Sequence, residues 1–245
     1  MSKNISQFKF KQFSVSHYRS SMKVGVDGVL IGCWTDVEGS TKILDVGSGC
    51  GLITLMMAQR CPEADIIGID IDEPSCTEAL ENAKNSPWKD RINIINGDFP
   101  DILNIEYSKG FDLIVSNPPY FDSGISNIAT SRERARHQGS LSPFSLLASS
   151  VALLTPSGTL AMIMPTEFTS SLEEEANKLG YILKRKCFVR GHAEAPYKRV
   201  LLQWILKNDV LYLDETKIEH LTLESERGKP TDEYRQLCKD FYLKF

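Results

Sequence analysis

Short apolar runs alternate along the chain with longer segments of helical periodicity. The apolar runs lie at residues 42–46, 65–70, 92–95, 111–116 and 159–164. Continuous hydrophobicity over four to six residues is typical of strands that are buried on both faces of a sheet. The helical segments lie at residues 52–60, 73–85, 142–154 and 171–180. This alternation predicts a doubly wound α/β fold with a parallel sheet.

Two later apolar runs, at residues 182–190 and 199–207, predict two further strands, one of them antiparallel. The chain is therefore expected to form a seven-stranded, mostly parallel, Rossmann-like sheet over residues 42–206, with helices on both faces. Residues 231–245 predict a C-terminal helix capped by Thr231. No linker or repeat divides the sequence, so we expect residues 1–245 to form a single domain. Residues 1–40 are expected to be a basic extension packed on the ligand-binding side.

The formal net charge is −4, but basic residues are concentrated in three segments, at residues 1–26, 132–137 and 184–199. The negative net charge argues against a generic nucleic-acid binder. Each basic segment can simply be a solvated surface, and the alternative is that the three segments form one phosphate-binding patch. Adjacent strand residues point to opposite faces, so at most one of Lys198 and Arg199 should reach such a patch. The candidate phosphate-binding residues are Lys9, Lys11, Lys23, Arg132, Arg134, Arg136, Lys198 and Arg199.

The sequence gives no indication of a membrane segment, a signal peptide or a metal site. No apolar run reaches the length that spans a bilayer. The six cysteines are scattered, without a C-x-x-C pair or a histidine at metal-binding spacing. We therefore expect reduced thiols, no bound metal and a cytoplasmic location. We also expect a monomer.

Glycines follow the first predicted strand, where open α/β sheets bind their ligands. Gly47, Gly49 and Gly51 allow a tight turn and let a ligand approach the backbone. A dinucleotide-binding loop is one interpretation, but its third glycine would fall at Leu52. In addition, Asp45 would repel a pyrophosphate. A carboxylate at this position suits an ammonium group instead.

Acidic residues follow the second and third predicted strands. Asp70 has the spacing of a ribose-binding carboxylate, and Asp72 suits the cap of the next helix. Asp98 can accept a hydrogen bond from an adenine amine, with Phe99 beside the ring. The structural alternatives are a helix cap for Asp70 and a turn for Asp98. Read together with the glycines, these residues describe a nucleoside with an amino-acid arm and no phosphate, which is S-adenosylmethionine.

The fourth predicted strand ends in the sequence "SNPPY" at residues 116–120. An exocyclic amine is a poor nucleophile because its lone pair is delocalised. The side-chain carbonyl of Asn117 and the backbone carbonyl of Pro118 can accept its two N–H bonds and stabilise the charge that develops on methyl transfer. Pro118 and Pro119 hold this loop rigid, and Tyr120 offers a ring for stacking. Asn117 is also expected to contact the cofactor, and the structural alternative for the loop is a rigid turn.

Residues 42–164, with their N-P-P-Y motif, resemble the class I S-adenosylmethionine-dependent methyltransferases that modify amino groups. Residues 8–34, with "MKVGVDGVLIGCW" as the most specific part, and residues 231–245 resemble the bacterial valine-tRNA adenine-N6 methyltransferases. The resemblance implies methylation of adenine 37 in a valine tRNA, with the anticodon stem-loop as partner. Val26 stands where such relatives often have threonine, and Asp27 suits the methionyl end of the cofactor or a turn before a helix.

Other functions share parts of this pattern. Protein glutamine-N5 and rRNA guanine-N2 methyltransferases use near relatives of N-P-P-Y. A glutamine methyltransferase of this class needs a helical substrate domain, and only about forty residues precede the first predicted strand. A cofactor-binding RNA-binding module or chaperone that has lost catalysis is the alternative from another class. The intact loop at residues 117–120 weighs against it.

Overall fold

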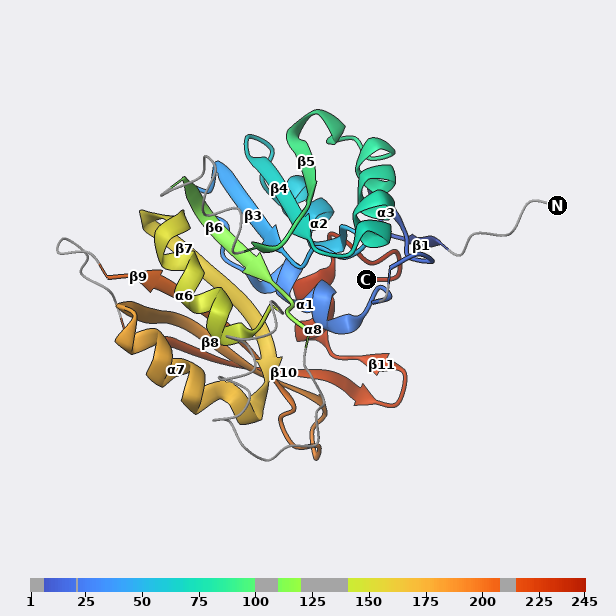
Figure 1. Ribbon diagram of the computed structural model, residues 1–245. Helices are drawn as coiled ribbons and strands as arrows, with labels where there is room; N and C mark the ends of the chain where they lie inside the picture. The colour runs from blue at the N-terminus through green and yellow to red at the C-terminus, as the bar shows by residue number, and fades with distance from the viewer. Residues whose placement is uncertain (1–6, 21, 100–109, 120–140, 208–214) are drawn as a thin grey trace.

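A mixed sheet forms the centre of the computed structural model, which describes residues 7–20, 22–99, 110–119, 141–207 and 215–245 (Figure 1). In the described residues the sheet has nine strands. In sheet order they are β11 (Lys229–Pro230), β10 (Lys217–Glu226), β8 (Tyr181–His192), β9 (Arg199–Leu206), β7 (Leu154–Pro165), β6 (Phe111–Ser116), β3 (Lys42–Val46), β4 (Asp65–Asp70) and β5 (Ile92–Asn96).

The strand directions confirm the predicted doubly wound, mostly parallel core. β3, β4, β5, β6 and β7 are paired in parallel. β9 is antiparallel to both β7 and β8, as the two late apolar runs predicted. The expected number of seven strands was too low, because β10 and β11 extend the sheet beyond residue 206. β10 was missed because polar and charged residues separate its apolar residues Ile218, Leu221 and Leu223, so it has no continuous apolar run.

Helices cover both faces of the sheet, also as predicted (Figure 1). Successive residues of β3 point to opposite faces, so Ile43 joins one apolar cluster and Leu44 the other. The first cluster includes side chains of α1 (Val26–Trp34), α2 (Leu52–Arg60) and α8 (Asp232–Cys238). The second includes side chains of α6 (Pro143–Leu153) and α7 (Thr169–Lys178). α3 (Glu73–Lys84) packs against β4 and β5.

The N-terminal segment folds back onto the helices. β1 (Gln7–Lys9) and β2 (Ser14–Ser16) form a hairpin, and Phe10 pairs by an isolated bridge with Tyr242 near the C-terminus. The buried amide of Asn82 in α3 binds both backbone groups of Ser16 and also the carbonyl of Cys50. These bonds attach the hairpin to the start of α2. After the hairpin, the chain continues into α1.

All six cysteines are buried, and none forms a disulfide. Among the residues that the structure describes, no group of three metal-ligating side chains lies close enough to hold an ion. No helix in the described ranges has the length and apolar character needed to cross a membrane.

Candidate active site

Three parallel strands end side by side and bring the predicted site residues to one edge of the sheet. Val46, the last residue of β3, pairs with Ile69 on one side and with Ser116 on the other. The Ser116 hydroxyl donates a 2.7 Å hydrogen bond to the carbonyl of Val46, which joins the ends of β6 and β3. Asn117 therefore starts its loop next to Gly47, as expected for parallel strands with matched ends.

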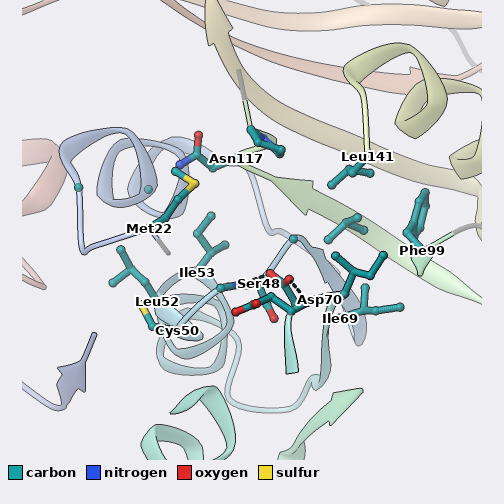
Figure 2. Close-up of a pocket in the computed structure, with 18 of the residues that line it drawn as sticks. Met22, Ser48, Cys50, Leu52, Ile53, Ile69, Asp70, Phe99, Asn117 and Leu141 are labelled. Atoms are coloured by element: carbon teal, nitrogen blue, oxygen red, sulfur yellow. Dashed lines mark hydrogen bonds between the residues drawn. The ribbon is translucent and has the colours of Figure 1, made fainter. Parts of the chain in front are cut away.

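A cavity of about 630 Å³ lies at this edge (Figure 2). In Figure 2, Asn117 and Met22 lie on one side of the cavity and Phe99 lies on the other. The predicted residues that line it are Gly47, Gly49, Asp70, Asp98, Phe99, Asn117, Pro119 and, among the basic candidates, Lys23. Pro118 is buried beside this lining. Tyr120, Arg132, Arg134 and Arg136 lie outside the described residues.

The glycine loop requires backbone conformations that side chains disfavour. Gly47 and Gly49 have φ values of 72° and 53°, in the left-handed region. An added Cβ on Gly49 would meet no atom within 4 Å, so the space over this backbone is open to a ligand. Gly51, at φ 81°, is not among the residues that line the cavity, and its cofactor contact stays a prediction. It caps α2, and a Cβ there would lie 3.2 Å from the Cβ of Ala79.

The carboxylate of Asp70 is oriented by the backbone around it. One oxygen accepts a 2.8 Å hydrogen bond from the nitrogen of Gly49, and the other accepts a 2.9 Å bond from the nitrogen of Asp72. A carboxylate has about four acceptor sites, so Asp70 retains capacity toward the cavity. Asp72 accepts from the nitrogen of Ser75 at 3.0 Å, which confirms the predicted helix cap.

Asp45 is not at the cavity surface, contrary to the predicted contact with an ammonium group. The period-two alternation of β3 points its side chain toward α2, on the same face as Ile43. There it is fully buried and accepts a 2.6 Å hydrogen bond from the hydroxyl of Thr54. Its other oxygen has no partner in the described part of the chain. Burial raises the pKa of Asp45 to about 7.

The segment before α1 forms one wall of the cavity. Met22, Lys23 and Asp27 line it. The ammonium group of Lys23 donates a 2.6 Å hydrogen bond to the carbonyl of His17. Asp27 forms a 2.8 Å ion pair with the Nε of Arg199, which ties the start of α1 to the start of β9.

The other basic candidates are dispersed. Lys11 donates to the backbone carbonyls of Lys239 and Phe245 and so holds the C-terminal segment, while its RNA contact stays a prediction. Lys9 lines a second, smaller cavity with residues of that segment. Lys198 is exposed, whereas its neighbour Arg199 is occupied by Asp27. These described residues thus have different surroundings, and a shared phosphate-binding patch stays a prediction.

Known proteins resemble the chain over almost its full length. A methyltransferase-domain family model matches residues 38–213. The tRNA1(Val) (adenine(37)-N6)-methyltransferase of Trichodesmium erythraeum is 41% identical, over 98% of this chain and 99% of its own. The protein of the same name from Bacteroides fragilis is also 41% identical, over 97% and 98%. The chain belongs to the tRNA1(Val) (adenine(37)-N6)-methyltransferase family.

Solved structures show the class I methyltransferase fold of this family. A protein of Agrobacterium tumefaciens described as a predicted O-methyltransferase has a TM-score of 0.65 at 16% identity, covering 88% of this chain and 96% of its own. A Listeria monocytogenes structure titled as a class I S-adenosylmethionine-dependent methyltransferase has a TM-score of 0.59 at 15% identity, covering 89% and 72%. At these identities the likeness concerns the fold alone.

Several residues of this methyltransferase site were missed from sequence. Ile71 lines the cavity with 67% of its surface exposed, between two aspartates. An apolar side chain directly after the predicted ribose-binding carboxylate was the signal for it. Ser48 lies in sequence between Gly47 and Gly49, which were predicted to contact the cofactor, and this position was the signal for it. Met22 and Leu141 had no such signal, because they reach the cavity from segments distant in sequence.

Proposed function

We propose that the protein transfers a methyl group from S-adenosylmethionine to N6 of adenine 37 in a valine tRNA. The family relationship supports this reaction and this substrate. The structural observation that carries the proposal is the position of Asn117, at the end of β6 and on the wall of the cavity, followed by two prolines. Because the substrate is a tRNA, the proposed activity belongs to the cytoplasm. We also propose that the protein acts as a monomer.

The cavity fits the proposed cofactor. Its volume of about 630 Å³ is within the usual range for small-molecule sites. Gly49 leaves the backbone open to an amino-acid arm, whereas a Cβ on Gly47 would lie 3.2 Å from the Cδ2 of Leu141. Asp70 is oriented to accept hydrogen bonds from ribose hydroxyls, and it is not neutralised by an ion pair with any described residue. Phe99, which is 4% exposed, supplies an apolar surface for the adenine ring.

The residues of the N-P-P loop are suited to activate an aromatic amine. When bound, S-adenosylmethionine supplies an electrophilic methyl group. The Asn117 amide oxygen and the Pro118 carbonyl are proposed to accept the two N–H bonds of the adenine amine. This stabilises the positive charge that nitrogen gains during attack. The two prolines fix the loop beforehand, so little reorganisation accompanies the reaction. No general base is needed before transfer, since the proton can leave afterward.

An anticodon loop is an accessible source of such an amine. Its bases are unpaired, so one adenine can turn into a cavity at a small cost in lost stacking. We therefore propose the anticodon stem-loop as the part of the tRNA that docks at this edge of the sheet.

Product analysis tests the proposal. The protein is incubated with isotope-labelled S-adenosylmethionine and an unmodified valine tRNA transcript, and the digested nucleosides are examined by mass spectrometry. Label in N6-methyladenosine is expected, and it should disappear when adenine 37 is replaced by guanine. A matched transcript with a second adenine of the loop replaced should still be labelled. Label in another nucleoside, or none with any tRNA, would contradict the proposed reaction.

A further inference from the structure

Three rings gather on the surface of the sheet where β8 and β10 pair. We call Phe188, Arg190, Tyr197 and His220 the aromatic–basic surface. The rings of Phe188 and His220 are stacked, with centroids 5.7 Å apart and planes 21° apart. The ring of Tyr197 lies 5.3 Å from that of His220. His220 is exposed, and the other two rings are half-buried, so part of each ring is open to solvent.

A fixed positive charge accompanies the rings. The guanidinium carbon of Arg190 lies 5.1 Å from the centroid of Tyr197, close enough for a cation–π interaction. Arg190 is held there by a 2.9 Å hydrogen bond to the hydroxyl of Thr222 and by another to the carbonyl of Ala193. Within the described part of the chain, no carboxylate pairs with Arg190 or with the exposed Lys198. Their charges are therefore not neutralised locally.

The aromatic–basic surface lies at the same edge of the sheet as the proposed active site. Arg199 pairs across β9 with Pro165 of β7 on one side and with Val189 of β8 on the other. Pro165 is three residues beyond Met162, which pairs with Ser116 next to Asn117. In addition, Arg199 is ion-paired to Asp27 on the cavity wall. Residues 197–199 thus connect the aromatic–basic surface to the cavity.

Stacking on rings beside cations is the usual way in which proteins hold unpaired nucleotides. Every base has a π-face, and arginine and lysine bind the phosphates that join the bases. A surface that only braced the turn at residues 193–198 would not require an oriented guanidinium or an exposed imidazole. We propose that the aromatic–basic surface binds an unpaired tRNA nucleotide near the target adenine, with its base on the rings and its phosphate against Arg190 or Lys198. This inference rests on the proposed function and extends its substrate contacts.

The test separates stacking from phosphate contacts by the salt dependence of tRNA binding. The dissociation constant of the valine tRNA transcript is measured at several salt concentrations for the wild type, Tyr197→Ala, His220→Ala and Lys198→Gln. Removal of a stacking ring typically weakens binding by about 1–3 kcal/mol, so each ring variant should raise the dissociation constant at least about fivefold. The salt slope of these variants should be unchanged. Lys198→Gln should instead lower the slope by about one.

Controls keep the outcome interpretable. Phe245→Ala removes another ring beneath a guanidinium, that of Arg235 at 5.4 Å, and should leave tRNA affinity unchanged. Tyr197→Phe should retain wild-type affinity, and the dissociation constant for S-adenosylmethionine should be unaffected in every variant. If Tyr197→Ala lowers the melting temperature, its weaker tRNA binding could reflect lost stability. The effect of His220→Ala on tRNA affinity is then the test, because His220 is exposed. Unchanged tRNA affinity in His220→Ala and Tyr197→Ala would overturn the inference. Methylation of adenine 37 by the wild type would still support the proposed function.

Discussion

The carboxylate of Glu78 lies 2.7 Å from the backbone nitrogen of Tyr18, which is 60 residues earlier in the chain. It also accepts hydrogen bonds from the nitrogens of Arg19, at 3.1 Å, and Ser20, at 2.9 Å. Burial raises the pKa of Glu78, but these hydrogen bonds outweigh burial and lower the pKa below its ordinary value. The charged carboxylate therefore fixes the segment that leads directly into the cavity wall at Met22.

Glu78→Gln should disturb this wall. Glutamine keeps one acceptor oxygen but turns an NH₂ group toward a backbone donor. Hydrogen bonds to charged groups are worth about 1.5–3 kcal/mol, so we expect a loss of unfolding free energy of about 2 kcal/mol. Calorimetry should also show weaker binding of S-adenosylmethionine. Glu81→Gln is the matched control on the same helix, since it removes only the exposed 2.8 Å ion pair with Arg19. Equal effects of the two substitutions would refute the role of Glu78.

Asn117→Ala should act on turnover. Loss of one transition-state contact typically lowers kcat by about 10²–10³-fold, whereas binding of the methyl donor depends mainly on other residues of the cavity. We expect that reduction in single-turnover methylation of tRNA, with a largely unchanged dissociation constant for S-adenosylmethionine. Asn85→Ala, at the C-terminal end of α3, is a control outside the cavity. Normal turnover in Asn117→Ala would remove the proposed role of the amide.

Asp70→Ala should act on cofactor binding. The substitution removes the proposed ribose acceptor and the two bonds that orient the loops at Gly49 and Asp72. We expect the dissociation constant for S-adenosylmethionine to rise by at least about tenfold, corresponding to one or two lost charge-assisted hydrogen bonds. The control Asp72→Ala removes the cap of α3 and should lower stability by about 1 kcal/mol with a smaller effect on binding. A purely catalytic defect in Asp70→Ala would contradict the assignment.

Asp45→Asn should change how stability depends on pH. The pKa of Asp45 is raised to about 7 in the folded protein, above the ordinary value of 3.8. Between these two values the unfolded chain releases the proton and the folded chain retains it, so the wild type loses stability as pH rises. From pH 5 to pH 8, its unfolding free energy should fall relative to Asp45→Asn by on the order of 2–3 kcal/mol. Urea titrations that give parallel pH profiles for the two proteins would contradict the buried, proton-binding carboxylate.

Lys23 and Lys11 should differ in their effect on tRNA binding. Lys23 lines the cavity, whereas Lys11 is bound to carbonyls of the C-terminal segment. Lys23→Gln should reduce the salt slope of tRNA binding by about one, and Lys11→Gln should lower the melting temperature without changing that slope. The reverse pattern would show that the hairpin carries the RNA contact.

The core and the strand-end residues could be predicted because they depend on local pattern. β3, β4 and β6 have the bounds that the apolar runs indicated, since most of their positions are apolar and buried on both faces of the sheet. The same period-two pattern could have placed Asp45 on the α2 face with Ile43.

The remaining contacts depend on pairs that are distant in sequence. Asp27 and Arg199 are 172 residues apart, and from sequence each would be predicted to be an unrelated charged residue on the surface. Glu78 reads as an ordinary solvated residue of a helix until the N-terminal segment is placed over it. The aromatic–basic surface also needs the pairing of β8 with β10, because Phe188 and His220 are brought opposite each other only by that register.

Gly32 and Met56 have a consequence for altering ligand selectivity. A Cβ on Gly32 would lie 2.5 Å from the sulfur of Met56, so a larger residue at this position of α1 would press on the Met56 side chain of α2. Both helices begin at the cavity, at Val26 and Leu52, although neither Gly32 nor Met56 lines it. This contact inside the core therefore helps to set the spacing of two helices whose first residues line the cavity. We expect that redesign for a bulkier methyl-donor analogue will have to consider this helix contact as well as the residues that touch the ligand.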